Sequence, residues 1–250
     1  MALITDEAFV ITSSEWRETS LIIRCYTREH GKLGIIAKGI RRPKTRIGSP
    51  LETFSHVEIV FFLKPGADLA TLKEADTLDY YPMIRKDLVR FGLASFFFEI
   101  LDSGVEAHER HPALYTLISH FLSALNREDL PPESVSPYFL FLAGELGFSP
   151  RLDKCALCPS LDNLLFFDPG QGRTVCSGCK GKGRDLIPLP KILREEMIKA
   201  LSQEQGRKEF EPWQRGIAPS FFLLMQRFIE YHLEKRLKSA DFLLKQIAET

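Results

Sequence analysis

The sequence lacks an excess of charge of either sign. It contains 33 lysines and arginines and 33 aspartates and glutamates, so its formal net charge is zero. A protein that is basic over its whole surface, and attracts nucleic acid through its net field, is therefore excluded. Charged residues make up 26% of the 250 residues and hydrophobic residues 44%, which is typical of a folded protein with a sizeable core. Any electrostatic partner must be held by a local patch.

Long apolar runs are also missing. The longest uninterrupted run extends from Tyr138 to Gly144, whereas a membrane-spanning helix needs about 18 or more apolar residues. The first seven residues contain two acids and no base, unlike the start of a signal peptide. We therefore expect a cytoplasmic protein that does not enter a membrane.

Motifs for catalysis are absent as well. The segment 108–111 is HERH and not HExxH, and no G-x-S-x-G occurs. The H-x-E at residues 56–58 is not followed by the P-C-x-x-C that a zinc deaminase requires, since neither C-x-x-C pair is preceded by proline. Gly34 and Gly39 have the spacing of a P-loop, but Ile40 stands where the lysine should be. We expect a protein that is not an enzyme.

The first 80 residues have the pattern of short β-strands. Apolar residues alternate or form short runs, with turn residues at His30–Lys32 and Lys64–Asp68. Five strands without an intervening helix predict a small barrel, of the OB-fold type or, nearly as well, of the SH3-like type. The five expected strands are centred on Phe9–Ile11, Leu21–Cys25, Ile35–Ala37, Val57–Leu63 and Ala70–Leu72.

Helical spacing begins after Tyr81 and Pro82, and it is interrupted at residues 151–188, where cysteine, glycine and aspartate become frequent. The sequence therefore predicts an α+β chain of two domains. Residues 1–80 form the barrel, and residues 81–250 form a helical domain with a loop-rich insert at about 151–188. Helices are expected at 84–102 and 112–126, and a third follows the loop that holds Pro131 and Pro132 and runs to Gly147. Three more are expected at 190–202, 219–237 and 239–248.

Four of the five cysteines form two C-x-x-C pairs, Cys155 with Cys158 and Cys176 with Cys179, with seventeen residues between the pairs. This spacing can place four thiolates at the corners of a tetrahedron, the geometry that Zn²⁺ takes. Because four thiolates leave no open position, we expect one structural zinc ion per chain, which helps the insert to fold. A redox or chance pair of motifs is the alternative. Cys25 is expected to be a buried, inert thiol.

Positive charge is concentrated in one segment. Between Glu29 and Glu52 there is no acid, and there are six bases, Lys32, Lys38, Arg41, Arg42, Lys44 and Arg46. On a barrel loop these side chains would follow a line of phosphates, so we expect them to bind DNA. A solvated loop with a chance bias of charge is the alternative. A weaker excess of bases around the insert either extends this surface or is ordinary surface.

Aromatic residues are frequent, with 19 phenylalanines. Phe96–Phe98 and Phe221–Phe222 follow helical patterns and are expected in the core. Tyr26 and Phe54 lie in the barrel region, and the sequence leaves open whether they pack in the core or stack on bases.

Three stretches resemble the bacterial recombination mediator family RecO, in that family's order and over essentially the whole chain. Residues 38–44 resemble its basic loop, residues 139–155 its helix leading into a zinc site, and residues 232–243 its C-terminal signature. Two C-x-x-C pairs alone would be generic, but the three stretches together are specific. Since some RecO proteins lack the cysteines, the resemblance implies that zinc is not essential to the family's activity.

The resemblance implies an OB-fold and a non-catalytic protein of the bacterial nucleoid, which binds single- and double-stranded DNA and anneals complementary strands. It also implies that RecR is a partner in loading RecA onto DNA coated by single-strand-binding protein, for recombinational repair. The helical domain would bind the acidic, apolar C-terminal tail of single-strand-binding protein. Loose candidates for that contact are Arg227, Lys235, Arg236 and Lys238.

Two other functions are weighed against this one. The first is a zinc-stabilised adaptor whose basic loop contacts acidic protein or RNA, and salt-dependent binding to oligonucleotides would separate it from a DNA-binding mediator. The second is a metalloenzyme, which is disfavoured because four cysteines leave no open position on the metal.

Overall fold

The computed structural model describes residues 2–40, 51–64, 66, 69–203, 210 and 213–249. The chain divides into two compact units, each of which is made of two segments. The first unit comprises Met1–Pro82 and Val105–Leu122, and the second comprises Met83–Gly104 and Ser123–Thr250. The segment 105–122, which includes most of the second predicted helix, therefore clusters with the barrel strands.

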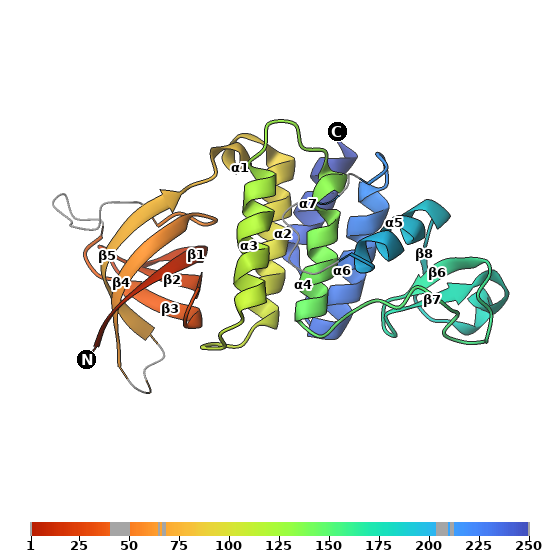
Figure 1. Cartoon of the computed structure of the whole chain (residues 1–250), viewed down its shortest axis with the longest axis horizontal. Coiled ribbons are helices and arrows are strands. Elements are labelled where there is room, and N and C mark those ends of the chain that lie inside the picture. The colour runs from red at the N-terminus through yellow and green to blue at the C-terminus, as the bar shows by residue number, and fades with distance from the viewer. Residues whose placement is uncertain are drawn as a thin grey trace. The chain divides into compact units, whose positions relative to one another are not determined.

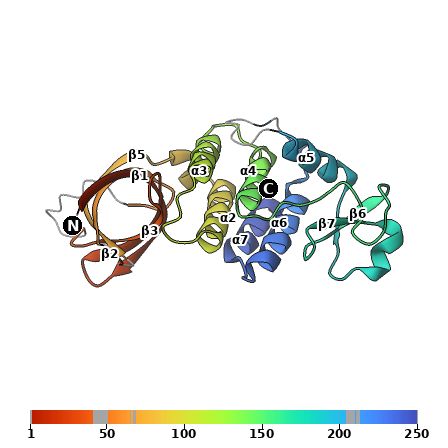
Figure 2. The same ribbon diagram turned by 60° about the horizontal axis from the view of Figure 1, so that its bottom comes forward.

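Five strands of the first unit close into a barrel, which Figure 1 shows from the side and Figure 2 shows as a ring. The strand order is β1-β2-β3-β5-β4, with β1 antiparallel to both β2 and β4 and with β3 parallel to β5. This closed five-stranded barrel confirms the predicted OB-fold. The strands are β1 (Ala2–Trp16), β2 (Ser20–Thr27), β3 (Gly31–Ala37), β4 (His56–Leu63) and β5 (Leu69–Asp79).

The barrel interior is filled by small and branched side chains, among them Ala8, Val10, Ile35 and Val57. Cys25 belongs to this core and is 2% exposed. Burial, with the nearby Asp6 carboxylate, raises the pKa of its thiol well above the usual value. The predicted burial of this thiol is confirmed, and its inertness stays a prediction.

A β-bulge changes the phase of β1 between Val10 and Thr12. Before the bulge, even-numbered residues such as Val10 line the core. After it, Ser13 lies opposite the core residue Ile23, so odd-numbered residues face inward. Trp16 would face the interior in a regular strand, but the bulge places it on the outer face, where it is 46% exposed.

One outer face of the barrel carries a row of rings from three adjacent strands. Phe9 lies opposite Tyr26 on β2 and opposite His56 on β4, so the three side chains share a face. The segment 105–122 covers this row, and the Tyr115 ring of α3 (Pro112–Leu125) lies 4.9 Å from the Phe9 ring between centroids. Phe9 and Tyr26 are fully buried as a result.

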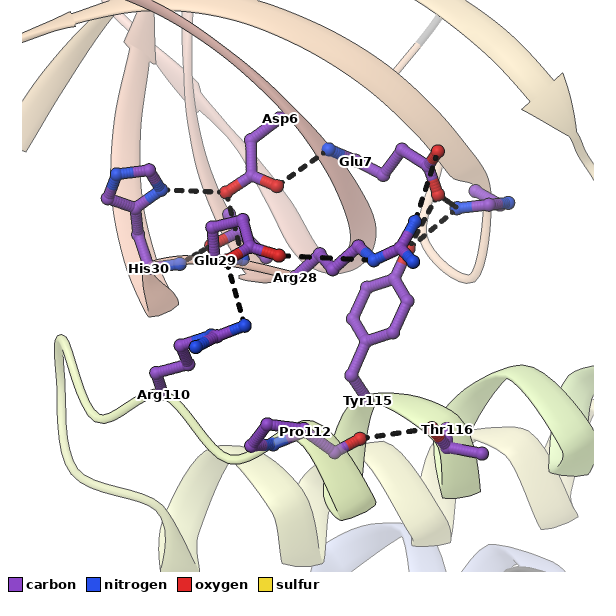
Figure 3. Close-up of polar contacts among 11 residues, drawn as sticks. Asp6, Glu7, Arg28, Glu29, His30, Arg110, Pro112, Tyr115 and Thr116 are labelled. Carbon is purple, nitrogen blue, oxygen red and sulfur yellow. Dashed lines mark hydrogen bonds and ion pairs between the residues drawn. The ribbon is translucent and has the colours of Figure 1, made fainter.

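Polar contacts fix the same segment against the barrel (Figure 3). The Tyr115 hydroxyl donates to Glu7 Oε2 at 3.1 Å, and Arg110 pairs with Glu29 at 2.9 Å. His56 Nε2 lies 3.0 Å from the Tyr115 oxygen and 3.4 Å from Glu7, but burial lowers the His56 pKa more than Glu7 raises it. Burial and then Glu7 raise the pKa of Tyr115. Both rings are therefore neutral at pH 7.

The helices of the second unit pack around a phenylalanine core. α7 packs against α2 and α6, and α4 packs against α5 and α6. The Phe139 ring lies 5.2 Å from both Phe96 and Phe222, and the predicted burial of Phe96–Phe98 and Phe221–Phe222 is confirmed. The bounds are α1 (Pro82–Lys86), α2 (Leu88–Gly104), η1 (Pro132–Val135), α4 (Ser136–Glu145), α5 (Lys191–Leu201), α6 (Ala218–Leu233) and α7 (Lys238–Ala248).

Two helices end earlier than the sequence pattern predicts. α4 stops at Glu145, and Gly147 follows it with a positive φ of 85°. α6 stops at Leu233, because Glu234 takes a left-handed conformation with a φ of 49°. None of the described helices is both long and apolar enough to cross a membrane.

The loop-rich insert contains a three-stranded sheet in the order β7-β6-β8. Its elements are β6 (Leu164–Asp168), β7 (Arg173–Cys176), η2 (Ser177–Lys182) and β8 (Ile187–Pro188). The Phe167 ring packs edge-on against Phe228 of α6, with 5.6 Å between ring centroids, and Arg194 Nε of α5 donates to the Leu152 carbonyl at 2.8 Å. These contacts hold the insert to the helices of its own unit.

We expect that Gly31→Ala will destabilise the first unit by about 2–5 kcal/mol, because it adds both backbone strain and a clash. Gly31 has a φ of 64°, and a Cβ there would lie 2.0 Å from the Glu109 carbonyl oxygen. Gly66→Ala is the matched control, since Gly66 has a φ of 72° but nothing within 4 Å of a Cβ, and it should cost only about 1 kcal/mol. Urea-induced unfolding measures the free energy of unfolding of both variants. Equal losses of stability would show that the close approach of the Glu109 carbonyl is not what requires glycine at position 31.

Candidate nucleic-acid interface and metal centre

The four cysteines of the insert converge on one point. Their Sγ atoms all lie within 4.8 Å of one another, and the Sγ atoms of Cys158 and Cys176 are 3.7 Å apart. Zn–S bonds of about 2.3 Å in a tetrahedron would separate the sulfur atoms by about 3.8 Å. All five cysteines of the chain are free thiols. The donor set and its spacing therefore fit a four-coordinate metal ion and not a disulfide pair.

Short backbone segments position the four sulfur atoms. Cys176 is the last residue of β7 and Cys179 lies in η2, which follows directly. Cys155 lies in a loop, and its Sγ accepts hydrogen bonds from the backbone N–H groups of Leu157 and Cys176, both at 3.4 Å. Hydrogen bonds donated to sulfur favour the thiolate form that binds metals.

The thiols of the cluster differ in acidity. Burial raises the pKa of Cys155, but the N–H groups of Cys176 and Leu157 outweigh it and lower the pKa to about 6. The shared hydrogen bond with Cys158, followed by burial, raises the pKa of Cys179 to about 12. Because neighbouring thiolates repel one another, the four groups cannot all ionise at neutral pH unless a cation lies between them.

The cysteines also supply much of the insert's small core. Cys155, Cys176 and Cys179 are at most 7% exposed and pack with Leu164 and Val175. So small an apolar cluster provides little hydrophobic stabilisation by itself. An ion held by the sulfur atoms would add the missing stabilisation.

The basic segment begins and ends on the barrel core. Ala37, the last residue of β3, is fully buried, and Leu51 is 4% exposed in the same apolar cluster. Lys38 is exposed directly after β3. The other four bases of the cluster lie outside the described residues, and they are Arg41, Arg42, Lys44 and Arg46. The two anchored ends tether the segment that carries them to the first unit.

Lys32 is not brought together with Lys38. It is the second residue of β3, whereas Lys38 follows its last residue, so about 20 Å of extended strand separates them. Its carbonyl accepts a hydrogen bond from the His108 N–H at 3.0 Å. Lys32 therefore lies near the segment 105–122 and at the other end of β3 from the basic segment.

Neither Tyr26 nor Phe54 is available to stack on a base. Tyr26 is fully buried, and its hydroxyl donates to the His111 carbonyl at 3.4 Å. Phe54 is 3% exposed, and its N–H donates to the Val10 carbonyl at 2.8 Å. Of the alternatives that the sequence left open, packing is correct. The exposed ring of the barrel strands is that of Trp16. Simple alternation along β1 would place this ring inside the barrel, whereas it lies on the outer face.

The four candidate bases near the C-terminus are all exposed. Three of them line a depression of about 470 Å³ together with Glu230, Glu234 and Asp241, and these are Arg227, Lys235 and Arg236. Arg236 pairs with Asp241 at 2.8 Å, and this contact, with a hydrogen bond from Gln226, lowers the pKa of Asp241. Lys238 is the first residue of α7 and does not line the depression. The surface is therefore mixed in charge and not basic.

Comparison with known proteins assigns the whole chain to one family. The family model described as "Recombination protein O N terminal" matches residues 1–81, and "Recombination protein O C terminal" matches residues 85–241. The two matches meet where the barrel strands end and the helices begin.

Two bacterial relatives match the chain over nearly their full length. The chain is 29% identical over 244 residues to the DNA repair protein RecO of Thermoanaerobacter sp. (strain X514), covering 97% of this chain and 98% of the relative. It is 30% identical over 239 residues to the protein of the same name in Myxococcus xanthus (strain DK1622), covering 95% and 96%. The chain therefore belongs to the RecO family of DNA repair proteins.

Proposed function

We propose that this protein binds single- and double-stranded DNA, anneals complementary strands and, together with RecR, helps to load RecA onto DNA coated by single-strand-binding protein. In this proposal it catalyses no reaction and acts only by binding DNA and its protein partners. One observation carries the proposal. An OB-fold barrel of a RecO-family chain holds both ends of a segment that has five bases and no acid between Lys38 and Arg46.

Annealing has a direct physical basis in that charge distribution. Two complementary strands repel each other through their phosphates, and a cluster of lysines and arginines lowers that repulsion. Base pairing then supplies the free energy. Phosphate contacts carry no information on sequence, so such a protein would act on any complementary pair. Pro43 restricts the backbone of the segment and reduces the entropy that is lost on binding.

We expect that replacing Arg41 and Arg42 together by alanine will weaken binding to single-stranded DNA and slow annealing. If four bases of the segment contact phosphates, the logarithm of the binding constant should fall with the logarithm of salt concentration with a slope of roughly −3. Loss of two contacts should make that slope shallower by about 1 to 1.5. Titrations with oligonucleotides at several salt concentrations measure it.

The double variant Lys191→Ala and Lys245→Ala is the control, because it removes the same charge from exposed positions on α5 and α7. It should leave the slope unchanged. If the Arg41 and Arg42 variant binds and anneals like the control, the basic segment is only solvated surface.

For the metal centre, we propose a structural zinc ion held by Cys155, Cys158, Cys176 and Cys179. The fit of the sulfur spacing and the small core of the insert support it. Zinc with four thiolates has no open position, so the ion would stabilise the fold and take no part in chemistry.

Purified protein should contain one zinc ion per chain, as measured by elemental analysis. Cys155→Ser or Cys179→Ser should lower the metal content and the solubility, because one ligand is lost and the insert loses folding energy. Cys25→Ala is the control, since Cys25 lies in the barrel core, and it should leave the metal content unchanged. A well-folded protein without metal would contradict the proposal, and a disulfide within either C-x-x-C pair would favour the redox alternative.

The helical unit is our proposed binding site for the acidic tail of single-strand-binding protein, with Arg227, Lys235, Arg236 and Lys238 as candidate contacts. Arg227 and Lys238 are the better targets for a test. Arg236 already pairs with Asp241, and Lys235 Nζ donates to Ser103 Oγ at 2.8 Å.

We expect that Arg227→Glu combined with Lys238→Glu will weaken binding of a tail peptide by about tenfold or more, because each change replaces an attraction by a repulsion. Binding to naked DNA should stay nearly intact. Lys191→Glu, on the exposed face of α5, serves as the control. Fluorescence anisotropy with labelled peptide and labelled DNA separates the two activities. Equal loss of both would assign these residues to DNA.

A further inference from the structure

The barrel has a depression where the β1–β2 hairpin meets the end of β3. Its volume is about 490 Å³, which is within the range of sites for small ligands. The whole of its lining belongs to the first unit, and it consists of Trp16, Arg17, Thr19, Ser20, Ile36, Lys38 and Gly39. The depression therefore joins the hairpin to the first residue of the basic segment.

The Trp16 indole gives this depression an exposed aromatic surface. The bulge in β1 turns Trp16 away from the core, and the ring is 46% exposed. Among the other rings of β1, β2 and β4, those of Phe9, Tyr26 and Phe61 are fully buried and that of Phe62 is partly buried. A single exposed apolar residue is ordinary on a protein surface, so the ring alone indicates no ligand. The indication of a ligand comes from the positively charged side chains of Arg17 and Lys38 beside it.

Two cations flank the indole without a counter-charge. Arg17 follows Trp16 in a three-residue turn and Lys38 follows β3, and both are exposed. In the part of the chain that the structure describes, neither forms an ion pair. Other cations of the same unit are paired, as Arg28 is with Glu7 and Arg110 with Glu29. Arg17 and Lys38 are therefore free to meet an anion.

The two acids of the hairpin do not occupy the depression. Glu15 and Glu18 flank the cation Arg17 in sequence, but neither contributes to the lining. Glu15 is exposed, but after the bulge it lies opposite Leu21, whereas Trp16 lies opposite Ser20, so the side chains of Glu15 and Trp16 leave the strand on opposite faces. The lining itself carries two positive charges and no negative one.

We propose that Trp16 stacks against one unpaired base of single-stranded DNA, while Arg17 and Lys38 contact the phosphates on either side of it. This inference rests on the DNA binding proposed above and adds a means of selecting single strands. Stacking on an aromatic side chain accepts any base, because every base has a π face, and OB-folds bind oligonucleotides near the β1–β2 loop. In a duplex, both faces of an internal base are already stacked, so Trp16 would contribute to single strands and not to duplexes.

The two tryptophans of the chain allow a direct test. Trp213 is 5% exposed and packs against Phe221, so Trp213→Phe leaves Trp16 as the reporter of intrinsic fluorescence. Adding a dT oligomer of about 16 nucleotides, the upper site size of one such barrel, should quench this emission. The same quenching should be seen above a constant background in the wild-type chain and should be absent in Trp16→Phe.

Affinities supply an independent measurement. Trp16→Ala should weaken binding of the dT oligomer by about 5- to 100-fold, as expected for the loss of one base stack. Binding of an abasic oligomer of the same length, and of duplex DNA, should change by less than about twofold, because phosphate contacts dominate there. Leu69→Ala is the control, since Leu69 is a 40% exposed apolar residue of the same barrel, and it should behave like the wild type.

Four results would overturn the inference. If Trp16→Ala binds the dT oligomer like Leu69→Ala and Trp16 is not quenched, stacking is wrong while the proposed DNA binding stands. If Trp16→Ala weakens abasic and base-bearing oligomers equally, the indole supports the loop and contacts no base. If polyglutamate quenches Trp16 and the dT oligomer does not, the patch binds acidic protein. If the wild-type chain binds no DNA, the proposed function fails together with the inference.

Discussion

Closure of the barrel by β1 is the constraint on which the first unit depends. The first half of this strand pairs with β4 and the second half with β2, so one strand of 15 residues joins both edges of the sheet. A strand can serve both neighbours only if it bends, and the bulge after Val10 provides the bend. The same irregularity turns Trp16 outward and leaves Phe9 on the face that segment 105–122 covers. The exposed position of Trp16 thus follows from how the sheet closes.

The three parts of the chain obtain their stability by different means. The barrel buries small and branched side chains, and the helical unit packs phenylalanine rings around Phe139. The insert has only a small buried cluster of its own, which consists of three cysteines with Leu164 and Val175. A metal ion held by the four sulfur atoms would therefore stabilise the part of the chain where buried apolar surface is scarce.

Much of the fold could be predicted from the sequence, because its strongest signals are local. The alternation in β2 and β3, the proline at the start of α3 and the two C-x-x-C pairs each specify their own structure within a few residues. The face of Trp16 could not be predicted, because a bulge has no distinct sequence pattern and reverses every later side chain of its strand. The burial of Tyr26 could not be predicted either, because it depends on contacts with residues 109–111, which are distant in the sequence. The clustering of segment 105–122 with the barrel was equally hidden, since its contacts with Glu7 and Phe9 span about a hundred residues.

Charge and stacking would have separate effects on an annealing reaction. Contacts to phosphates bind single strands and duplexes alike, so the basic segment alone would hold the product as firmly as the substrates. A base stacked on Trp16 must leave the indole before it can pair within a helix. Stacking would therefore favour the separated strands over the annealed product. Once the strands have paired, the duplex would make no stacking contact with Trp16. A barrel with both features can collect single strands by charge and by stacking and retain the duplex by charge alone, which favours release of the product.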